Sequence, residues 1–389
     1  MRVEHHVRAF EQILKNYDGV MPLHRFLFTY FKQNKQMGSS DRRWATRYSY
    51  SFFRLGKALP KLEPIERLAI GDFLCHTTSS LIVETYLKEL APHVADLLSE
   101  KIKLIQKKYA KFKLEDVFVL HDQLSPAIEK DKFLRSFFLQ PHLFIRVKGT
   151  HIKAVTDQLV SKGIPVEEVI ENALMLPNGT KLEEVINDAR LYQVQDLSSQ
   201  KTGAYFEPKK YDYWWDCCAA SGGKSLLLHD LEPTIQLLVS DVRENSLINL
   251  DERFQLAGIK KYHKKVVDLL QNNDQMLHHY EFDGILLDAP CSGSGTWGRT
   301  PEMLYYFDAY KIENYVKLQK AFAENVIKYL KPGKPLIYMT CSVFKAENES
   351  VVAYIEENCP VKLEKMESIK GYNDKADSMF VARFIKNMA

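Results

Sequence analysis

The spacing of apolar positions changes along the chain and divides it into three regions. In residues 1–113, apolar residues recur every three or four positions, as in "VRAFEQILKNY" and "WATRYSYSFFRLGKAL". This spacing is typical of amphipathic helices. Turn residues interrupt the pattern at Gly38–Asp41 and near Pro60, where helices are expected to end or begin. We therefore predict an all-helical N-terminal domain.

The spacing of apolar positions changes after residue 113. "LFIRVK" is strand-like, "HIKAVTDQLVSKG" reads as a helix that ends at Gly163, and "PVEEVIENALMLPNG" returns to extended character. A strand, a helix and further strands in this order indicate a small α/β unit. We predict a ferredoxin-like module over residues 114–205.

From residue 206 to 389, short apolar runs alternate with helical patterns. "YDYWWDCC" is the first predicted strand, and "AASGGKSLLLHDL" follows as a glycine-rich turn and a helix. Later strands end on Asp241, Asp268 and Asp288, "KPLIYMTCS" is a further strand, and "MFVARFIK" closes the domain. This alternation is typical of a doubly wound, mainly parallel sheet. The third region is thus predicted to be a Rossmann-like α/β domain.

Composition narrows the class of protein. The 389 residues are 46% hydrophobic and 26% charged, which is ordinary for a globular protein. No apolar run approaches the ~18 residues of a membrane span, and the N-terminus lacks the apolar core of a signal peptide. We expect a cytoplasmic protein, monomeric by default. Six cysteines without a CxxC pair argue against disulfides and against a metal site.

The net charge of +3 does not by itself indicate a nucleic-acid partner. Two segments, Lys101–Lys113 and Lys260–Lys265, mix lysines with aromatic residues. This mixture occurs on surfaces that contact phosphates, but also on ordinary solvated faces. Both interpretations stay open at this point.

The glycine-rich turn of "CAASGGKS", residues 218–223 (the Gly loop), is a candidate ligand site. A P-loop requires a glycine where Cys218 stands, and a dinucleotide fingerprint requires three spaced glycines where only Gly222 and Gly223 are present. Both nucleotide classes therefore match poorly. A P-loop NTPase stays as an alternative that binding of ATP with magnesium would support.

Carboxylates at the strand ends favour a different ligand. Asp241 follows the Gly loop by about twenty residues, where an acid can accept both hydroxyls of a ribose. Asp268 is suited to the edge of an adenine, and Asp288 closes the next strand. These acids outline a site for an adenosine without a phosphate chain. S-adenosylmethionine fits this description.

Four segments carry a resemblance to a known family. "DCCAASGGKS", "SDVRENSLINL", "LLDAPCSGSGTWGRTPE" and "YMTCSVFKAENESVV" resemble the motifs of the Nop/Sun (RsmB-type) family of S-adenosylmethionine-dependent RNA cytosine-5 methyltransferases. "VQDLSSQ" is similar to the family segment that precedes the first strand, so the resemblance extends from Val194 to Val352. The helical region is compatible with the NusB-like, RNA-binding domain of RsmB-type members.

The resemblance implies roles for individual residues. Cys341 would attack carbon 6 of cytosine and Cys291 would assist elimination, because carbon 5 is too poor a nucleophile without a covalent adduct. Asp288 would contact the N3 edge of the base, where a burial-raised pKa would help it act as an acid. The implied methyl-donor site comprises Cys218, Ala219, Ala220, Ser221, Gly222, Gly223, Lys224, Asp241, Arg243, Asp268, Asp288 and Pro290.

Two departures from the family pattern stand out. Ser221 occupies a position where proline is usual, and Ser378-Met379-Phe380 replaces a glycine-aromatic pair before the last strand. The remaining cysteines, Cys75, Cys217, Cys218 and Cys359, are interpreted as structural, with Cys218 also able to line the methyl-donor pocket. The pairs His5-His6 and His278-His279 are interpreted as surface residues.

Together these features predict an enzyme that methylates carbon 5 of an unpaired or flipped cytosine. The resemblance favours ribosomal RNA as substrate and transfer RNA as the alternative. A non-catalytic RNA-binding ribosome assembly factor is the competing hypothesis. It is disfavoured by the presence of both Cys291 and Cys341 together with Asp288.

Overall fold

The computed structural model describes residues 2–388 and divides into two compact units. One unit holds the chain up to Leu124 together with Glu129–Gln140 and Thr296–Ala309. The other holds Ser125–Ile128, Pro141–Gly295 and the chain from Tyr310 onward. In the described part of the chain, no helix combines the length and the apolar character that crossing a membrane requires.

The first unit is helical, as its apolar spacing predicts. Its core contains aromatic residues at helical spacing, such as Phe10, Tyr48 and Phe52. His6, expected at the surface, is 8% exposed and stacks on Trp44 with the ring centroids 5.7 Å apart. The α-helices are α1 (Arg2–Asn16), α2 (Leu23–Gln33), α3 (Ser39–Arg54), α4 (Pro64–Cys75), α5 (Leu81–Tyr86), α6 (Leu98–Lys108), α7 (Lys130–Ser136) and α13 (Met303–Tyr306).

This unit extends beyond the predicted boundary at residue 113. The buried guanidinium of Arg54 donates to the carbonyl of Phe137 at 2.5 Å and to the carbonyl of Gly298 at 2.7 Å. In addition, the backbone N–H of Leu23 donates to Glu302 at 2.9 Å. Buried polar groups must find partners, and these partners come from segments far along the chain. A boundary drawn from local spacing could not include them.

The basic segment Lys101–Lys113 is not a uniform surface. Lys101 is 3% exposed, and its ammonium donates to the carbonyls of Phe73, His76 and Val94. Burial lowers its pKa. Lys103 and Lys108 pair with Glu100 and Glu89. Part of the segment therefore serves the helical core and local ion pairs.

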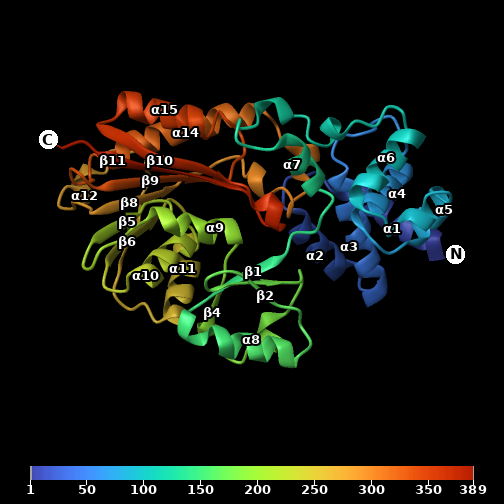
Figure 1. Cartoon of the computed structure of the whole chain (residues 1–389), viewed down its shortest axis with the longest axis horizontal. Helices are drawn as coiled ribbons and strands as arrows, with labels where there is room; N and C mark the ends of the chain where they lie inside the picture. Colours follow the sequence, from blue (N-terminus) through green and yellow to red (C-terminus); the bar gives the residue numbers. More distant parts are fainter. Residues whose placement is uncertain (1, 389) are drawn as a thin grey trace. The chain divides into compact units, whose positions relative to one another are not determined.

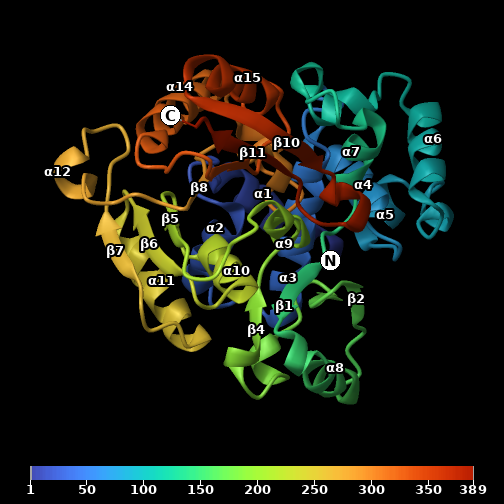
Figure 2. The same ribbon diagram turned by 60° about the vertical axis from the view of Figure 1, so that its left-hand side comes forward.

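The second unit contains a small antiparallel sheet of order β2-β3-β1-β4. Its strands are β1 (Leu143–Val147), β2 (Glu167–Ile170), β3 (Ala173–Leu176) and β4 (Tyr192–Val194). Helix α8 (Ile152–Ser161) packs on it through Val155 and Leu159, in the lower part of Figure 2. The strand order is that of a ferredoxin-like sheet, whereas the second helix is reduced to short 3₁₀ turns.

The main sheet has seven strands in the order β10-β11-β9-β8-β5-β6-β7. Strands β5 to β9 pair in parallel, and β11 runs antiparallel between β9 and β10. This mainly parallel sheet confirms the predicted Rossmann-like fold. The strands are β5 (Tyr213–Asp216), β6 (Gln236–Asp241), β7 (His263–Val266), β8 (Gly284–Asp288), β9 (Pro335–Thr340), β10 (Val361–Ile369) and β11 (Met379–Lys386).

Helices cover both faces of this sheet (Figure 1). On one face Trp214, Leu286 and Met339 pack against α10 (Gly223–Leu231) and α11 (Glu244–Ala257). On the other, Trp215, Leu287 and Tyr338 pack with α14 (Tyr310–Ile327) and α15 (Glu349–Asn358). Because successive strand residues point to opposite faces, continuous apolar strands fill both layers.

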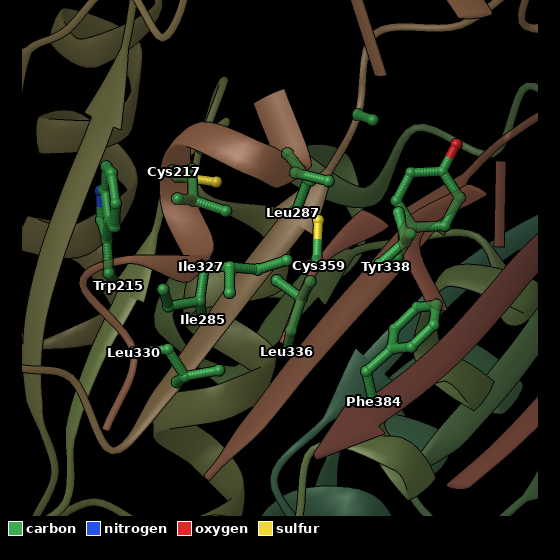
Figure 3. Packing of buried hydrophobic residues seen from close by; sticks show 14 of the residues in the cluster. Trp215, Cys217, Ile285, Leu287, Ile327, Leu330, Leu336, Tyr338, Cys359 and Phe384 are labelled. Atoms are coloured by element: carbon green, nitrogen blue, oxygen red, sulfur yellow. The ribbon is translucent and has the colours of Figure 1, made fainter. Parts of the chain in front are cut away.

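Two of the cysteines lie in this core. Cys217 and Cys359 sit among Ile285, Leu287 and Leu336 in the layer of Figure 3. Cys217 is 1% exposed, and its thiol donates to the carbonyl of Leu286 at 3.1 Å. Burial raises the pKa of both thiols. Both cysteines are therefore structural, as expected.

Candidate active site

The carboxyl edge of the parallel strands gathers the residues that the sequence singled out. The strand order places β5 between β8 and β6, with β9 beyond β8 and β7 beyond β6. The Gly loop follows β5, and Asp241, Asp268 and Asp288 lie at or just after the ends of β6, β7 and β8. Ligands of open α/β sheets bind at this edge.

The two candidate thiols meet there. Cys291 follows β8 and Cys341 follows β9, and their Sγ atoms are 3.3 Å apart without a disulfide between them. Both residues are partly exposed. The backbone holds the two loops together, because Gly295 N–H donates to the carbonyl of Cys341 at 2.9 Å and Ala289 N–H donates to that of Met339 at 2.9 Å. Two thiols fifty positions apart thus form one site.

The environment of Cys291 favours its protonated form. A hydrogen bond to Cys341, burial, and the negative charges of Cys341 and Glu347 all raise the pKa of the Cys291 thiol. A thiol acts as a nucleophile only as the thiolate. The raised pKa therefore favours the thiol form of Cys291, and either sulfur can donate in the contact between the two residues.

Asp288 is ion-paired rather than buried. The ammonium of Lys224 donates to Asp288 Oδ2 at 2.9 Å and to Ser199 Oγ at 2.9 Å. The Lys224 side chain is 9% exposed and that of Asp288 29%. Asp288 is therefore only partly buried, and it forms an ion pair with the buried side chain of Lys224.

The Gly loop has an unusual backbone. Gly222 has φ +82° at the start of α10, and Ala220 has φ +45°, a conformation that costs energy for a residue with a side chain. Ala220 N–H donates to Asp241 Oδ2 at 3.0 Å, and Ala219 N–H donates to the carbonyl of Ser240 at 2.9 Å. Strand β6 therefore fixes the loop that begins after β5.

Ser221, which replaces the usual proline, is fixed by a side chain from α11. Arg253 Nη1 donates to Ser221 O and to Ser221 Oγ, each at 3.0 Å. Arg253 Nη2 also donates to Gln193 Oε1 on β4 at 3.2 Å. Gln195, just after β4, donates to the carbonyl of Gly223 at 3.1 Å. The small sheet and α11 thus support the loop where proline would have stiffened it.

Asp241 is 6% exposed and well supplied with hydrogen-bond donors. Its Oδ1 accepts the backbone N–H of Arg243 at 2.9 Å and Arg243 Nε at 3.1 Å. The Arg243 side chain is 67% exposed, so it can rotate away when a ligand hydroxyl approaches. Asp268 is held by the backbone N–H of Leu270 at 2.9 Å.

These groups fit an adenosine-bearing methyl donor. Asp241 would accept the ribose hydroxyls, Asp268 lies one strand further along the edge, and the strained Gly loop would present backbone to the rest of the ligand. Within residues 2–388, no group of three or more His, Cys, Asp or Glu side chains is arranged to hold a metal ion.

A further carboxyl group, Asp216, lies beneath the Gly loop. It is fully buried, accepts a hydrogen bond from Ser225 Oγ at 2.6 Å, and leaves its Oδ1 atom without a hydrogen-bond partner. Burial, with repulsion from Asp288 in addition, raises its pKa to about 7. The sequence analysis gave this residue no role.

The departure at Ser378-Met379-Phe380 reaches the site. Ser378 N–H donates to the carbonyl of Gly295 at 2.9 Å, and Met379 Sδ lies 3.9 Å from Lys224 Nζ. A Cβ atom on Gly295 would lie 2.0 Å from the carbonyl oxygen of Ser378. Glycine at position 295 therefore allows the last loop to approach the thiol loops.

The sequence analysis also missed a buried group between the thiol loops. Glu347, Gln319 and Ser342 are each at most 2% exposed and are joined by hydrogen bonds. The only signal for Glu347 was its place in the "ENE" segment that carried the family resemblance. No spacing rule relates Glu347 to Gln319, because Gln319 lies on α14 and strand β9 separates it from Glu347.

The part of the chain that contains the candidate active site is similar to known proteins. Residues 204–385 match the family model described as 16S rRNA methyltransferase RsmB/F. Ribosomal RNA small subunit methyltransferase B from Shewanella oneidensis is 32% identical over 174 residues, which cover 44% of this chain and 40% of that protein. The match to the curated relatives thus spans about half or less of their length.

Solved structures extend the likeness in fold. The crystal structure of PH0851 matches with a TM-score of 0.73 at 22% identity and covers 98% of both chains. NSun6 from Pyrococcus horikoshii with SFG matches with a TM-score of 0.60 at 19% identity, covering 70% of this chain and 97% of that one. These two structures therefore share the fold of this chain.

Proposed function

We propose that this protein, whose residues 204–385 match the family model described as 16S rRNA methyltransferase RsmB/F, is an RNA cytosine-5 methyltransferase that uses S-adenosylmethionine. The observation that carries the proposal is the pair of partly exposed thiols, Cys291 and Cys341, with Sγ atoms 3.3 Å apart at the ends of adjacent strands. Carbons 5 and 6 of cytosine are bonded neighbours. Two thiols at this spacing can therefore act on both carbon atoms of one bound cytosine.

Cys341 is the nucleophile in this proposal. Its thiolate bonds to carbon 6, N3 gains a proton, and carbon 5 becomes enamine-like and able to attack an electrophile. When bound, S-adenosylmethionine supplies an electrophilic methyl group. The pKa of the Cys291 thiol is raised first by its hydrogen bond to Cys341, and this cause is lost once the Cys341 sulfur is bonded to carbon.

Cys291 can then release its proton to solvent and act as a base. Its thiolate removes the proton of carbon 5, the electron pair re-forms the double bond between carbons 5 and 6, and the Cys341 sulfur leaves as the thiolate. The N3 proton is returned at the same time. Each thiol thus ends in the state in which it can begin again, and no oxidant or reductant is needed.

Lys224 and Asp288 are proposed to serve the N3 edge. Asp288 is partly exposed at the end of β8, and Lys224 Nζ donates a hydrogen bond to its Oδ2 at 2.9 Å. The pair can lend this proton while the adduct exists and recover it on release. The role of Asp288 is thereby shared with Lys224 rather than created by burial.

The methyl-donor site is proposed to use the Gly loop with Asp241, Arg243, Asp268 and Pro290. The support is their common place at the carboxyl edge and the hydrogen bond from Ala220 to Asp241. Asp241 is ready to accept ribose hydroxyls once the Arg243 side chain moves. Cys218, the first residue of the Gly loop, is partly exposed.

Ribosomal RNA is the proposed substrate, since the relatives are named ribosomal RNA small subunit methyltransferase B. The helical region 1–113 and the module 114–205 are proposed to hold structured RNA by shape and phosphate contacts. The cytosine must leave its stack to reach the thiols. A cytoplasmic, monomeric enzyme is the accompanying prediction, and transfer RNA is the alternative substrate.

The test uses the wild type, Cys341→Ala and Cys291→Ala with cellular RNA, assembling ribosomal subunits and labelled methyl donor. We expect label on cytosine with the wild type, neither label nor adduct with Cys341→Ala, and a denaturant-resistant RNA adduct with Cys291→Ala. Cys75→Ala serves as the thiol control and should behave as the wild type. Absence of both label and adduct on every RNA would favour the non-catalytic assembly factor.

A further inference from the structure

A buried carboxylate connects the two thiol loops. Glu347 is 0% exposed. Its Oε1 accepts the backbone N–H of Ser292 at 2.8 Å, while its Oε2 accepts Ser292 Oγ at 2.6 Å and Ser342 Oγ at 2.5 Å. Ser292 directly follows Cys291, and Ser342 directly follows Cys341. One side chain therefore holds the neighbours of both thiols.

A glutamine from α14 completes this arrangement. Gln319 Nε2 donates to Glu347 Oε1 at 3.2 Å and to the carbonyl of Pro290, the residue before Cys291, at 2.9 Å. Cys291 is thus held on both sides, through Pro290 and Ser292. We call Glu347, Ser292, Ser342 and Gln319 the Glu347 network.

The position of Glu347 is itself well fixed. Tyr338 Oη donates to the carbonyl of Glu347 at 2.6 Å, and the backbone N–H of Glu347 donates to the carbonyl of Phe344 at 3.2 Å. Asn348, the next residue, donates through Nδ2 to the carbonyl of Ser342 at 2.9 Å. The carboxylate is therefore a rigid reference point against which both loops are placed.

Burial makes this network selective for one geometry. A carboxylate without water is costly unless hydrogen-bond donors surround it. Here the donors come from two loops and a helix, so all of them are satisfied only when both loops are docked. Loosening either loop would leave the carboxylate under-supplied. The network thus penalises any other separation of the two sulfur atoms.

We propose that Glu347 is a positioning residue that sets the separation and mutual orientation of the Cys291 and Cys341 thiols. Its catalytic meaning rests on the proposed function, because only a reaction that needs both thiols gains from a fixed spacing. Glu347 does not touch the base. It acts through Ser292 and Ser342.

The test separates positioning from catalysis with a probe that needs no RNA. A trivalent phenylarsenical bonds to two neighbouring thiols with loss of water and holds tightly only when both are within reach of one arsenic atom. We would measure its affinity for the wild type, Glu347→Ala, Glu347→Gln and the matched control Glu349→Gln. Glu349 lies two residues further and contacts Ser125 instead of the thiol loops. Cys291→Ala and Cys341→Ala define capture by one thiol.

We expect Glu347→Ala to lose at least tenfold in arsenical affinity, approaching the single-thiol level, with Glu347→Gln between it and the wild type. Glu349→Gln should stay within twofold. Methylation by Glu347→Ala should show kcat reduced at least tenfold with KM for RNA within twofold, since the RNA-holding surfaces are untouched. Circular dichroism and thermal melting establish that each variant is folded.

A folded Glu347→Ala protein that captures the arsenical like the wild type would overturn the positioning role, whatever its methylation activity. Conversely, a loss of capture in Glu347→Ala beside a wild type that methylates no RNA would retain the positioning role and reject the proposed function. If the alanine variant does not fold, Ser342→Ala decides: it removes one hydroxyl, and unchanged arsenical affinity would again overturn the proposal.

Discussion

The two sides of the carboxyl edge are built in different ways. On the proposed methyl-donor side, after β5, β6 and β7, part of the network is open to solvent: Arg243 pairs with Asp241 two residues away, and the Arg243 side chain is 67% exposed. On the thiol side, after β8 and β9, Cys291, Gln319 and Glu347 come from three distant segments, and Glu347 is fully buried.

This difference predicts how each side responds to change. Exposed pairs exchange protein partners for water at low cost, so the methyl-donor side should lose affinity in modest steps. Buried networks fail as a unit, because each lost partner leaves another polar group unsatisfied. The thiol side should therefore show larger effects, on kcat rather than on ligand affinity.

Lys224 tests the connection between the two sides and should give the largest effect. Lys224 lies in the first turn of α10, and its Nζ atom donates to Asp288 Oδ2 at 2.9 Å. Lys224→Ala should lower single-turnover methylation by about 100-fold or more, because a charge-assisted contact at the reacting base is lost. The control is Lys201→Ala, which breaks only the Asp374 pair and should change the rate less than threefold.

Asp241 tests the methyl-donor side alone. Replacing it with asparagine removes a charged acceptor worth on the order of 1–2 kcal/mol, or about tenfold in Kd for the methyl donor. Calorimetric titration with S-adenosylmethionine would measure this loss. At saturating methyl donor the rate should stay within threefold. A large fall in kcat without a change in Kd would contradict the proposed division between the two sides.

Changes at Ser221 and Arg253 should have a smaller effect on methyl-donor binding. Arg253→Ala removes the two hydrogen bonds to Ser221 and should weaken methyl-donor binding about threefold, since net hydrogen bonds of this kind contribute roughly 0.5–1.5 kcal/mol. Adding Ser221→Pro, the usual family residue, should restore part of the affinity by stiffening the loop. Unchanged affinity in Arg253→Ala would show that the loop needs no such support.

Asp216 offers a prediction about stability. Its pKa is raised to about 7 in the folded protein, against about 3.9 in an unfolded chain. Between these values the folded state binds the extra proton, so this group stabilises the fold below pH 4, and the contribution is lost as pH rises through 7. The slope is at most about 1.4 kcal/mol per pH unit.

Thermal melting of the wild type and Asp216→Asn across pH 4 to 8 isolates this contribution. The stability of the asparagine variant relative to the wild type should rise with pH, because asparagine cannot ionise. Parallel melting curves at all pH values would show that Asp216 has no raised pKa. Groups that titrate in the same way in both proteins do not contribute to the difference in stability between them.

Much of the fold could be predicted from local patterns, but strand β10 and the extent of the helical unit could not. Strand β10, "VKLEKMESI", was not predicted, because its lysines and glutamates match an exposed edge strand rather than a core strand. The helical unit also recruits Thr296–Ala309 from within the catalytic region. Arg54 shows why, since its buried guanidinium finds acceptors in segments that only the folded chain brings near.

The Rossmann-like sheet, the Gly loop and the acids and cysteines at its edge could be predicted from the sequence, because strand spacing and strand-end chemistry are local properties. Three features follow from the folded chain: the two thiols lie 3.3 Å apart, Lys224 is the partner of Asp288, and Glu347 holds both thiol loops. These contacts depend on strand order and on the need of buried polar groups for partners. Neither can be read from neighbouring residues.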